Sequence, residues 1–192
     1  MDSSAVKQLF INARALLSGH FLLSSGLHSD TYFQSALILQ HPVHAAQIAS
    51  ALAEKVMAAT PKIDVVVSPA LGGIVIGQEM GRALGCRAVF CERVDGKLVL
   101  RRGFSLGKGE KVLVVEDVVT TGLSTREVVD VVTALGGAVV GVASLVDRSA
   151  GKVSFGVPFS SLLCLEVSSY KPEVCPLCKE GTPAVKPGSR AQ

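Results

Sequence analysis

Short apolar runs alternate with polar, glycine-containing segments through the middle of the chain. The runs at 64–68 and 111–116 are rich in valine and other apolar residues, which is typical of strands that are buried on both faces. Between such runs, residues 74–84 and 124–135 carry apolar positions at helical spacing, and each stretch is followed by glycine. The alternation predicts strand–helix–strand units, which build a mostly parallel sheet with helices on both faces.

The same pattern, extended along the sequence, predicts one domain of the α/β class that covers residues 1–192. Helices are expected at 5–17, 43–59, 74–84 and 124–135, and strands within 20–26 and 31–34 and at 64–68, 87–92, 97–100, 111–116, 138–146 and 162–167. The strands at 87–92 and 97–100 are expected to form a hairpin that turns at Asp95-Gly96. The domain divides into an N-terminal part (about 1–38), a core (about 39–167) and a tail (about 168–192). Prolines and glycines in the tail predict an extended segment that packs on the surface, with a loose end from about Gly188.

The composition is apolar for a protein without membrane segments, with 48% hydrophobic residues and a mean hydropathy of +0.45. The longest apolar runs, at 63–77 and 134–146, contain polar residues or glycine and are shorter than the roughly 20 residues that span a bilayer. The first residues lack a basic stretch followed by an apolar one, so we expect a cytoplasmic protein with reduced thiols. A net charge of +3 and 5% aromatic residues give no clustered basic face for nucleic acid.

The strand predicted at 111–116 runs into two adjacent carboxylates, Glu116 and Asp117, and then into a loop of small residues that ends in a helix. Backbone N–H groups of such a loop, together with the start of the helix and the hydroxyls of Thr120 and Thr121, form a site for a monophosphate. The acids would repel phosphate, so they require another partner, either ribose hydroxyls or a divalent cation. The plainer alternative is that Ser124 caps the helix and that the acids are solvated.

Two further strand ends carry candidate binding groups. Ser68–Gly73 forms a small-residue turn into a helix, which suits a second anionic group but is equally compatible with an ordinary turn. Arg148 follows the strand at 138–146, and its planar guanidinium fits a carboxylate or an imide edge, although a surface ion pair is the plainer interpretation. The basic segment at 92–109 either neutralises a pyrophosphate leaving group or is a solvated hairpin.

The tail contains one CxxC pair, Cys175 and Cys178. A zinc site needs two more ligands, and the neighbouring sequence supplies neither a second pair nor a histidine. Cys164 or a second copy of the chain would have to contribute, so we predict a structural role without metal. His20, His41 and His44 are expected to be ordinary core or surface residues.

Read together, these motifs resemble a known family. VLVVEDVVTTGLS (112–124) is similar to the signature with which phosphoribosyltransferases bind phosphoribosyl diphosphate. The segments 19–34, 68–77, 90–104, 112–124 and 146–151 fall in the order seen in the orotate phosphoribosyltransferase family and cover most of residues 19–151. The resemblance implies a phosphoribosyltransferase-like fold whose N-terminal part forms a small hood over the base.

The resemblance also implies an activity and its site residues. The activity is the Mg²⁺-dependent transfer of phosphoribosyl from phosphoribosyl diphosphate to orotate, which gives orotidine 5′-monophosphate and pyrophosphate in pyrimidine biosynthesis. Residues implied to bind phosphoribosyl diphosphate are Ser68, Ala70, Leu71, Gly72, Glu116, Asp117, Val118, Val119, Thr120, Thr121, Gly122, Leu123 and Ser124. Thr120, Arg148 and His28 are implied at the orotate, and Arg93, Lys97, Arg101, Arg102 and Asp117 in catalysis. Mg²⁺ would be held mainly by substrate rather than by side chains, and the basic loop would reach into the partner's site in a homodimer.

Three departures from the family pattern stand out. His28 replaces a lysine that many members carry, arginines replace most lysines and a histidine of the basic loop, and Leu123 stands where a small residue is usual. Two rival functions stay open: a phosphoribosyltransferase for another base, and a non-catalytic regulator that binds phosphoribosyl diphosphate. A transferase for another base is disfavoured because Arg148 and the hood suit an anionic base. A non-catalytic regulator is disfavoured because the basic loop, which such a protein would not need, is present.

Overall fold

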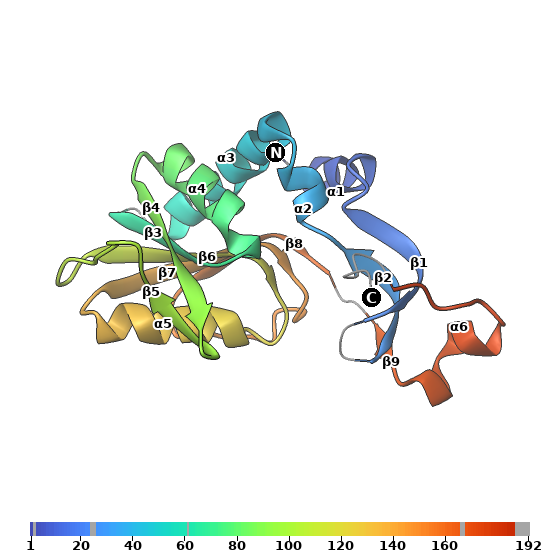
Figure 1. Cartoon of the computed structure of the whole chain (residues 1–192). Helices are drawn as coiled ribbons and strands as arrows, with labels where there is room; N and C mark the ends of the chain where they lie inside the picture. Colours follow the sequence, from blue (N-terminus) through green and yellow to red (C-terminus); the bar gives the residue numbers. More distant parts are fainter. Residues whose placement is uncertain (2, 24–25, 61, 166–167, 187–192) are drawn as a thin grey trace.

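The chain is built around a six-stranded sheet in a computed structural model that describes residues 1, 3–23, 26–60, 62–165 and 168–186 (Figure 1). The strand order is β5-β4-β3-β6-β7-β8, and every neighbouring pair is parallel except the β4–β5 hairpin. The strands are β3 (Val65–Pro69), β4 (Arg87–Val94), β5 (Lys97–Leu100), β6 (Lys111–Val119), β7 (Ala138–Asp147) and β8 (Phe159–Cys164). The predicted α/β class, the mostly parallel sheet and the hairpin at Asp95-Gly96 are confirmed.

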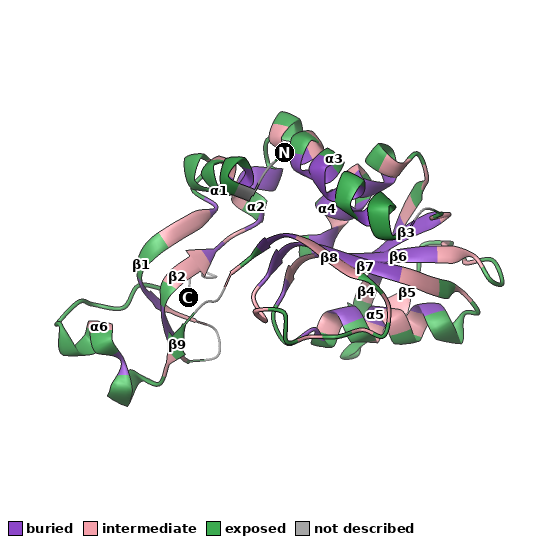
Figure 2. Cartoon of the chain, turned by 180° about the vertical axis from the view of Figure 1, so that it is seen from behind, coloured by how far each residue is buried: buried purple, intermediate pink, exposed green. Residues whose placement is uncertain are grey.

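Helices cover both faces of this sheet. On one face α1 (Ser3–Asn12), α3 (Pro42–Ala59) and α4 (Gly72–Leu84) pack on alternate strand residues such as Val66 and Leu113. On the other face α5 (Leu123–Ala134) packs on the intervening residues, such as Val65 and Val67. Burial on both faces explains the unbroken apolar runs of β3 and β6, and Figure 2 shows these strands as buried. Within the described residues, no helix is both long and apolar enough to cross a membrane.

A second, three-stranded sheet forms the hood. Its order is β1-β2-β9, with β1 at Leu16–Leu22, β2 at His28–Phe33 and β9 at Ser169–Tyr170, and both pairings are antiparallel. The short helix α2 (Ala36–Leu39) leads from the hood back to the core. Figure 1 shows the hood beside the core, with the two ends of the chain contributing neighbouring strands to it.

The tail folds back onto the hood, and part of it is helical where an extended segment is predicted. It contains a 3-10 turn, η1 (Pro172–Val174), and one turn of helix, α6 (Pro176–Lys179). Further along, Val185 pairs with β1: its N–H donates to the carbonyl of His20, and its carbonyl accepts from the N–H of Leu22, both at 2.8 Å. The loose end predicted from Gly188 lies outside the described residues.

Several element boundaries differ from the prediction, and three of them illustrate the difference. The helix predicted at 5–17 ends at Asn12, because Arg14 has a φ of 54° and Leu16 already pairs with Phe33 in the hood. The strand predicted at 111–116 continues to Val119, which pairs with Asp147 of β7. The last core strand ends at Cys164, earlier than the predicted 162–167, whose last two residues are not described. Each shift reflects strand pairing between distant segments, which the local pattern does not encode.

Candidate active site

The three strand ends singled out in the sequence meet at one edge of the sheet. β3, β6 and β7 are neighbours and parallel, so their carboxyl ends point the same way. The N–H of Arg148 donates to the carbonyl of Val119 at 2.8 Å, which sets Arg148 beside the start of the loop after β6. The crevice beyond the carboxyl ends of parallel strands is where α/β proteins bind their ligands.

Two carboxylates at the end of β6 lie in different environments. Glu116 is buried, and this burial, followed by the charge of Asp117, raises the pKa of its carboxyl to about 9. Asp117 is half-buried and accepts hydrogen bonds from the Ser35 hydroxyl and, at 2.9 Å, from the N–H of Val118. The protein therefore holds Asp117 in a fixed orientation and keeps Glu116 neutral near pH 7. Ser35 follows the hood strand β2, and no motif in the sequence marks it.

The raised pKa predicts that Glu116→Gln stabilises the ligand-free protein at neutral and alkaline pH. The folded protein binds the Glu116 proton more tightly than the unfolded chain does, so this carboxyl lowers stability progressively from pH 4.5 to about 9. Glutamine does not titrate. We expect the melting temperature of Glu116→Gln to exceed that of the parent by about 3 °C or more at pH 8, and by less at pH 5. Thermal unfolding across this pH range measures the difference, with Glu54→Gln at an exposed position of α3 as the control. A difference in melting temperature that does not change with pH would contradict a buried neutral Glu116.

The loop after β6 is shorter than predicted and begins at Thr120, because Val118 and Val119 are strand residues. Gly122 has a φ of 75° and precedes the first residue of α5. A Cβ there would lie 2.9 Å from Val153 and 3.0 Å from Phe155, so both conformation and space require glycine. Leu123, the family departure, starts α5 without a positive φ and is 64% exposed. Leucine is thus compatible with the turn, and its N–H, like that of Ser124, belongs to the open first turn of the helix.

The turn after β3 comes within contact distance of the acids. A Cβ on Gly72 would lie 2.8 Å from a carboxylate oxygen of Asp117, so the absence of a side chain lets the two loops approach. Leu71 is 85% exposed, and the N–H of Ala70 donates to the carbonyl of Cys91 at 2.8 Å. Ser68, predicted to face pyrophosphate, has its side chain buried beneath α4.

A pocket of about 320 Å³ separates this turn from the hood. Its walls come from the hood–core connection and from the strand ends; they comprise Gln34, Ser35, Ala36, Leu39, Gln40, Leu71, Gly72, Val75 and Asp117. Two slightly larger hollows lie along α3 on the outer helical face, away from the strand ends and their acids. The pocket at Asp117 therefore joins a cavity to a carboxylate at the strand ends.

The guanidinium of Arg148 is partly buried at the strand ends. Its Nε is buried and donates to no acceptor among the described residues, and burial lowers the pKa of its guanidinium while Tyr32 of the hood opposes that shift. The carboxylate of Asp147 accepts from the N–H groups of Ser149, at 2.7 Å, and Gly151, at 3.1 Å, which fixes the turn that carries Arg148. A partly desolvated guanidinium with an unused Nε–H is a site for an anionic ligand.

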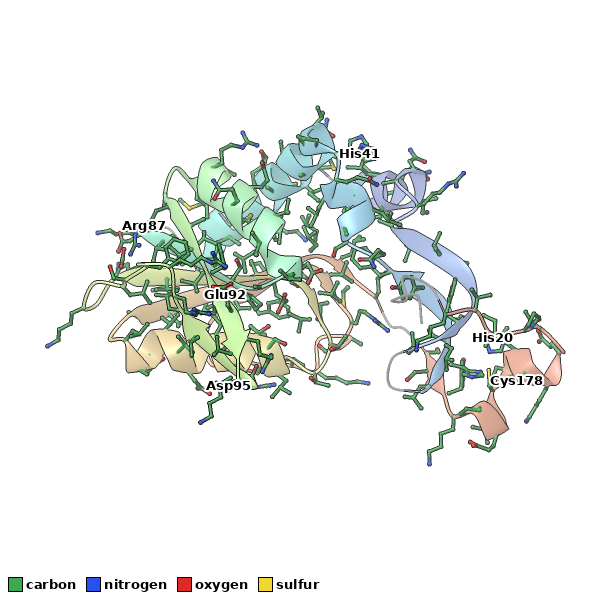
Figure 3. All side chains as sticks on the ribbon, viewed as in Figure 1. His20, His41, Arg87, Glu92, Asp95 and Cys178 are labelled. Carbon is green, nitrogen blue, oxygen red and sulfur yellow. The ribbon has the colours of Figure 1, made fainter. Side chains whose placement is uncertain are left out.

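The predicted basic residues lie on and just after the β4–β5 hairpin, and two of them are paired within the chain. Arg93 bonds Glu127 of α5 at 2.5 Å, and Arg102 bonds Glu92 at 2.7 Å. Among the described residues, Lys97 and Arg101 form no ion pair, and both are exposed. None of the ion pairs formed by this hairpin involves Asp117 or Arg148. Figure 3 labels Glu92, which lies on β4, and Asp95 at the tip of the hairpin, beside α5.

His28, predicted to contact orotate, is buried in the hood. Its Nδ1 lies 2.8 Å from Nε2 of His20 and 3.2 Å from Sγ of Cys178. The imidazole thus faces the tail rather than Arg148 or Thr120, which argues for a use of this side chain other than the predicted one. The hood residue that does approach Arg148 is Tyr32.

Comparison with known proteins identifies the class of this fold and site. Residues 35–168 match the family model described as "Phosphoribosyl transferase domain", a range that holds all three strand ends and the basic hairpin. A protein of Carboxydothermus hydrogenoformans named orotate phosphoribosyltransferase is 57% identical over 183 residues, covering 95% of this chain and 96% of that protein. Its namesake in Heliobacterium modesticaldum is 55% identical over 190 residues, covering 99% of this chain and 100% of that protein. The chain belongs to the orotate phosphoribosyltransferase family.

Solved structures agree with this family. The orotate phosphoribosyltransferase of Mycobacterium tuberculosis, in complex with Fe(III) dicitrate, has a TM-score of 0.67 and 28% identity, covering 83% of this chain and 95% of that one. The adenine phosphoribosyltransferase of Thermoanaerobacter pseudethanolicus, at 18% identity and a TM-score of 0.59, shares the fold and covers 70% of this chain and 88% of that one. The fold is thus common to enzymes named for different bases, and the choice of base rests on the site.

Proposed function

We propose that this protein transfers the 5-phosphoribosyl group from phosphoribosyl diphosphate to orotate, releasing pyrophosphate. The observation that carries the choice of orotate is the partly buried guanidinium of Arg148 at the edge of the acid-and-loop site, whose Nε has no hydrogen-bond partner among the described residues. Orotate is an anion, and a neutral base would leave that cation without compensation. Its near full-length relatives bear the same activity in their names.

The acids and the loop after β6 bind different parts of the sugar phosphate in this proposal. Thr120, Thr121 and the open N–H groups at the start of α5 suit the 5-phosphate, because they supply donors and a partial positive charge. Asp117, held by Ser35, offers carboxylate oxygens to the ribose hydroxyls. Glu116, neutral when the site is empty, can both donate to and accept from a hydroxyl.

The reaction breaks the bond between C1 of the ribose and the diphosphate oxygen. Positive charge develops on the sugar ring, and the negative charge of Asp117 stabilises it. Negative charge develops on the departing pyrophosphate, beside the turn at Ala70–Gly72 and within reach of a basic loop. A ring nitrogen of orotate then forms the bond to C1 and loses its proton to solvent, so no nucleophile from the protein is required and the five cysteines need not take part.

We further propose that Mg²⁺ is the cofactor. The one carboxylate oriented into the pocket, Asp117, suits an ion held mainly by the oxygens of the substrate, since Mg²⁺ prefers hard oxygen ligands and retains waters. When bound, Mg²⁺ would neutralise the diphosphate and make it a better leaving group.

The proposed assembly is a homodimer in which the basic hairpin of one subunit serves the site of the other. The exposure of Lys97 and Arg101 supports this, because both remain available to a partner while Arg93 and Arg102 are engaged by acids of their own chain. We also propose a cytoplasmic location, which suits an odd number of cysteines kept reduced.

A panel of bases tests the proposed activity. The protein is incubated with phosphoribosyl diphosphate and orotate, uracil, adenine, guanine or hypoxanthine, with and without Mg²⁺, and pyrophosphate release is followed. We expect release with orotate and Mg²⁺, and at least about 100-fold less with any uncharged base. Activity with a purine but not with orotate would identify another member of the class, and binding of phosphoribosyl diphosphate without release would identify a regulator.

A further inference from the structure

The hood and the tail bring together four side chains that the transferase reaction does not use. His20 lies on β1, His28 on β2, Cys175 directly before α6, and Cys178 within α6. Their ligand atoms all lie within 4.8 Å of one another, although the two pairs are about 150 residues apart in the chain. Figure 3 shows His20 and Cys178 facing each other where the tail meets the hood, far from Glu92 in the core.

The distances in this cluster match those around one tetrahedral metal ion. Cys175 Sγ and Cys178 Sγ lie 3.5 and 3.8 Å from Nε2 of His20, and Cys178 Sγ lies 3.2 Å from Nδ1 of His28. Zinc bonds of about 2.3 Å to sulfur and 2.0–2.1 Å to nitrogen imply ligand separations of roughly 3.3–3.8 Å at tetrahedral angles. The two imidazole nitrogens, at 2.8 Å, need to separate by only about 0.5 Å to fit.

The orientation of His20 is that of a metal ligand. Its Nδ1 lies 2.7 Å from the carbonyl of Thr182, and a carbonyl only accepts, so Nδ1 carries the proton. Nε2 is then unprotonated, and its lone pair points at His28 and the two thiols. Ligating histidines commonly donate their other N–H to a backbone carbonyl in this manner.

The tail has almost no apolar contact to hold it in place. Between Lys171 and Lys186, Cys175 is the one buried residue of the described chain, and Val174 and Val185 are 60% and 58% exposed. Figure 2 shows the tail as mainly exposed. Small elements that lack a hydrophobic core are commonly fixed by a structural metal or a disulfide. A cross-link at this point would tie the tail to strands β1 and β2 of the hood.

We propose that His20, His28, Cys175 and Cys178 bind one Zn²⁺ ion that fixes the C-terminal tail on the hood. Binding displaces a proton from each thiol, so two thiolates balance the charge of the ion. Four protein ligands leave no open position, which makes the site structural and not catalytic. A two-iron cluster is excluded by size, because it places its two cysteines and two histidines on different ions, whereas these ligand atoms share one small space.

Metal analysis of the full-length protein tests this site. The protein is purified under reducing conditions, its bound zinc is measured, and a second sample is stripped and reloaded with Co²⁺ under anaerobic conditions. We expect about one zinc per chain, and a Co²⁺ spectrum with the intense visible bands of tetrahedral coordination and the ultraviolet band of thiolate ligands. Both Cys175 and Cys178 should resist alkylation in the loaded protein and react after chelation.

Two substitutions make the test specific. Cys178→Ser should weaken zinc binding by at least about 100-fold, whereas Cys164→Ser, which alters an exposed thiol outside the cluster, should retain one zinc per chain. Equal zinc in the two variants, absence of zinc and of tetrahedral Co²⁺ bands in the parent, or a Cys175–Cys178 disulfide in the freshly purified protein would each overturn the proposal. Because these readouts are metal content and spectra, they do not depend on transferase activity.

Discussion

Asp117→Asn is expected to reduce kcat for orotate phosphoribosylation by about 10²- to 10³-fold while leaving the fold intact. The side chain stands at the end of β6, accepts from Ser35 and Val118, and lines the pocket between the strand ends and the hood. Asparagine has the same shape and retains one acceptor, so the substitution removes charge rather than volume. The loss falls on the transition state, because positive charge on the ribose ring is then no longer opposed.

The matched control is Asp130→Asn, which removes the same charge from an exposed position on α5. Steady-state rates of both variants, together with their melting temperatures, separate a catalytic defect from a folding defect. If Asp117→Asn turned over within about threefold of the control, the Asp117 carboxylate would not take part in the reaction. The proposed role of the acid pair would then be wrong.

Much of this site could be predicted because its parts are local in sequence. A buried strand, two acids, a hydroxyl-rich turn and the start of a helix follow one another within 111–124, and each part has a distinct pattern. The rule that parallel strands end at the same edge then placed Arg148 and the turn at Ser68–Gly73 near that segment, as the structure confirms.

The parts that escaped prediction depend on contacts between distant segments. Ser35 bonds Asp117 across 82 residues, and the cluster of His20 with Cys175 joins residues 155 apart. The local sequence around the CxxC pair contains no further candidate ligands, whereas the folding of the tail onto the hood brings two histidines beside it. The resemblance places His28 at orotate, whereas the fold buries it beside His20.

Two ionisable groups of the empty site are held in environments that disfavour their charged forms. Burial raises the pKa of Glu116 to about 9 and lowers the pKa of Arg148. Such groups reduce the stability of the free protein and become favourable only when a ligand supplies the missing partner. A substitution that removes such a group should therefore raise stability and lower activity. A residue that only supports the fold would not show these opposed effects.

Arg148→Met is expected to lower activity and to raise stability. We expect kcat/KM for orotate to fall by about 100-fold or more, because the variant retains the length of the side chain and loses the cation that faces an anionic base. At the same time, the melting temperature of the ligand-free protein should rise, since the buried Nε without a partner is replaced by an apolar group.

Arg82→Met serves as the control, because Arg82 is exposed on α4 and pairs with Glu79 at 2.6 Å. This substitution should change neither kcat/KM nor the melting temperature by much, as exposed ion pairs contribute about 0–1 kcal/mol. If Arg148→Met kept its activity with orotate, the guanidinium would not contact the base. If it lost activity and stability together, Arg148 would instead support the fold, because a residue that binds only the ligand cannot stabilise the protein in the ligand's absence.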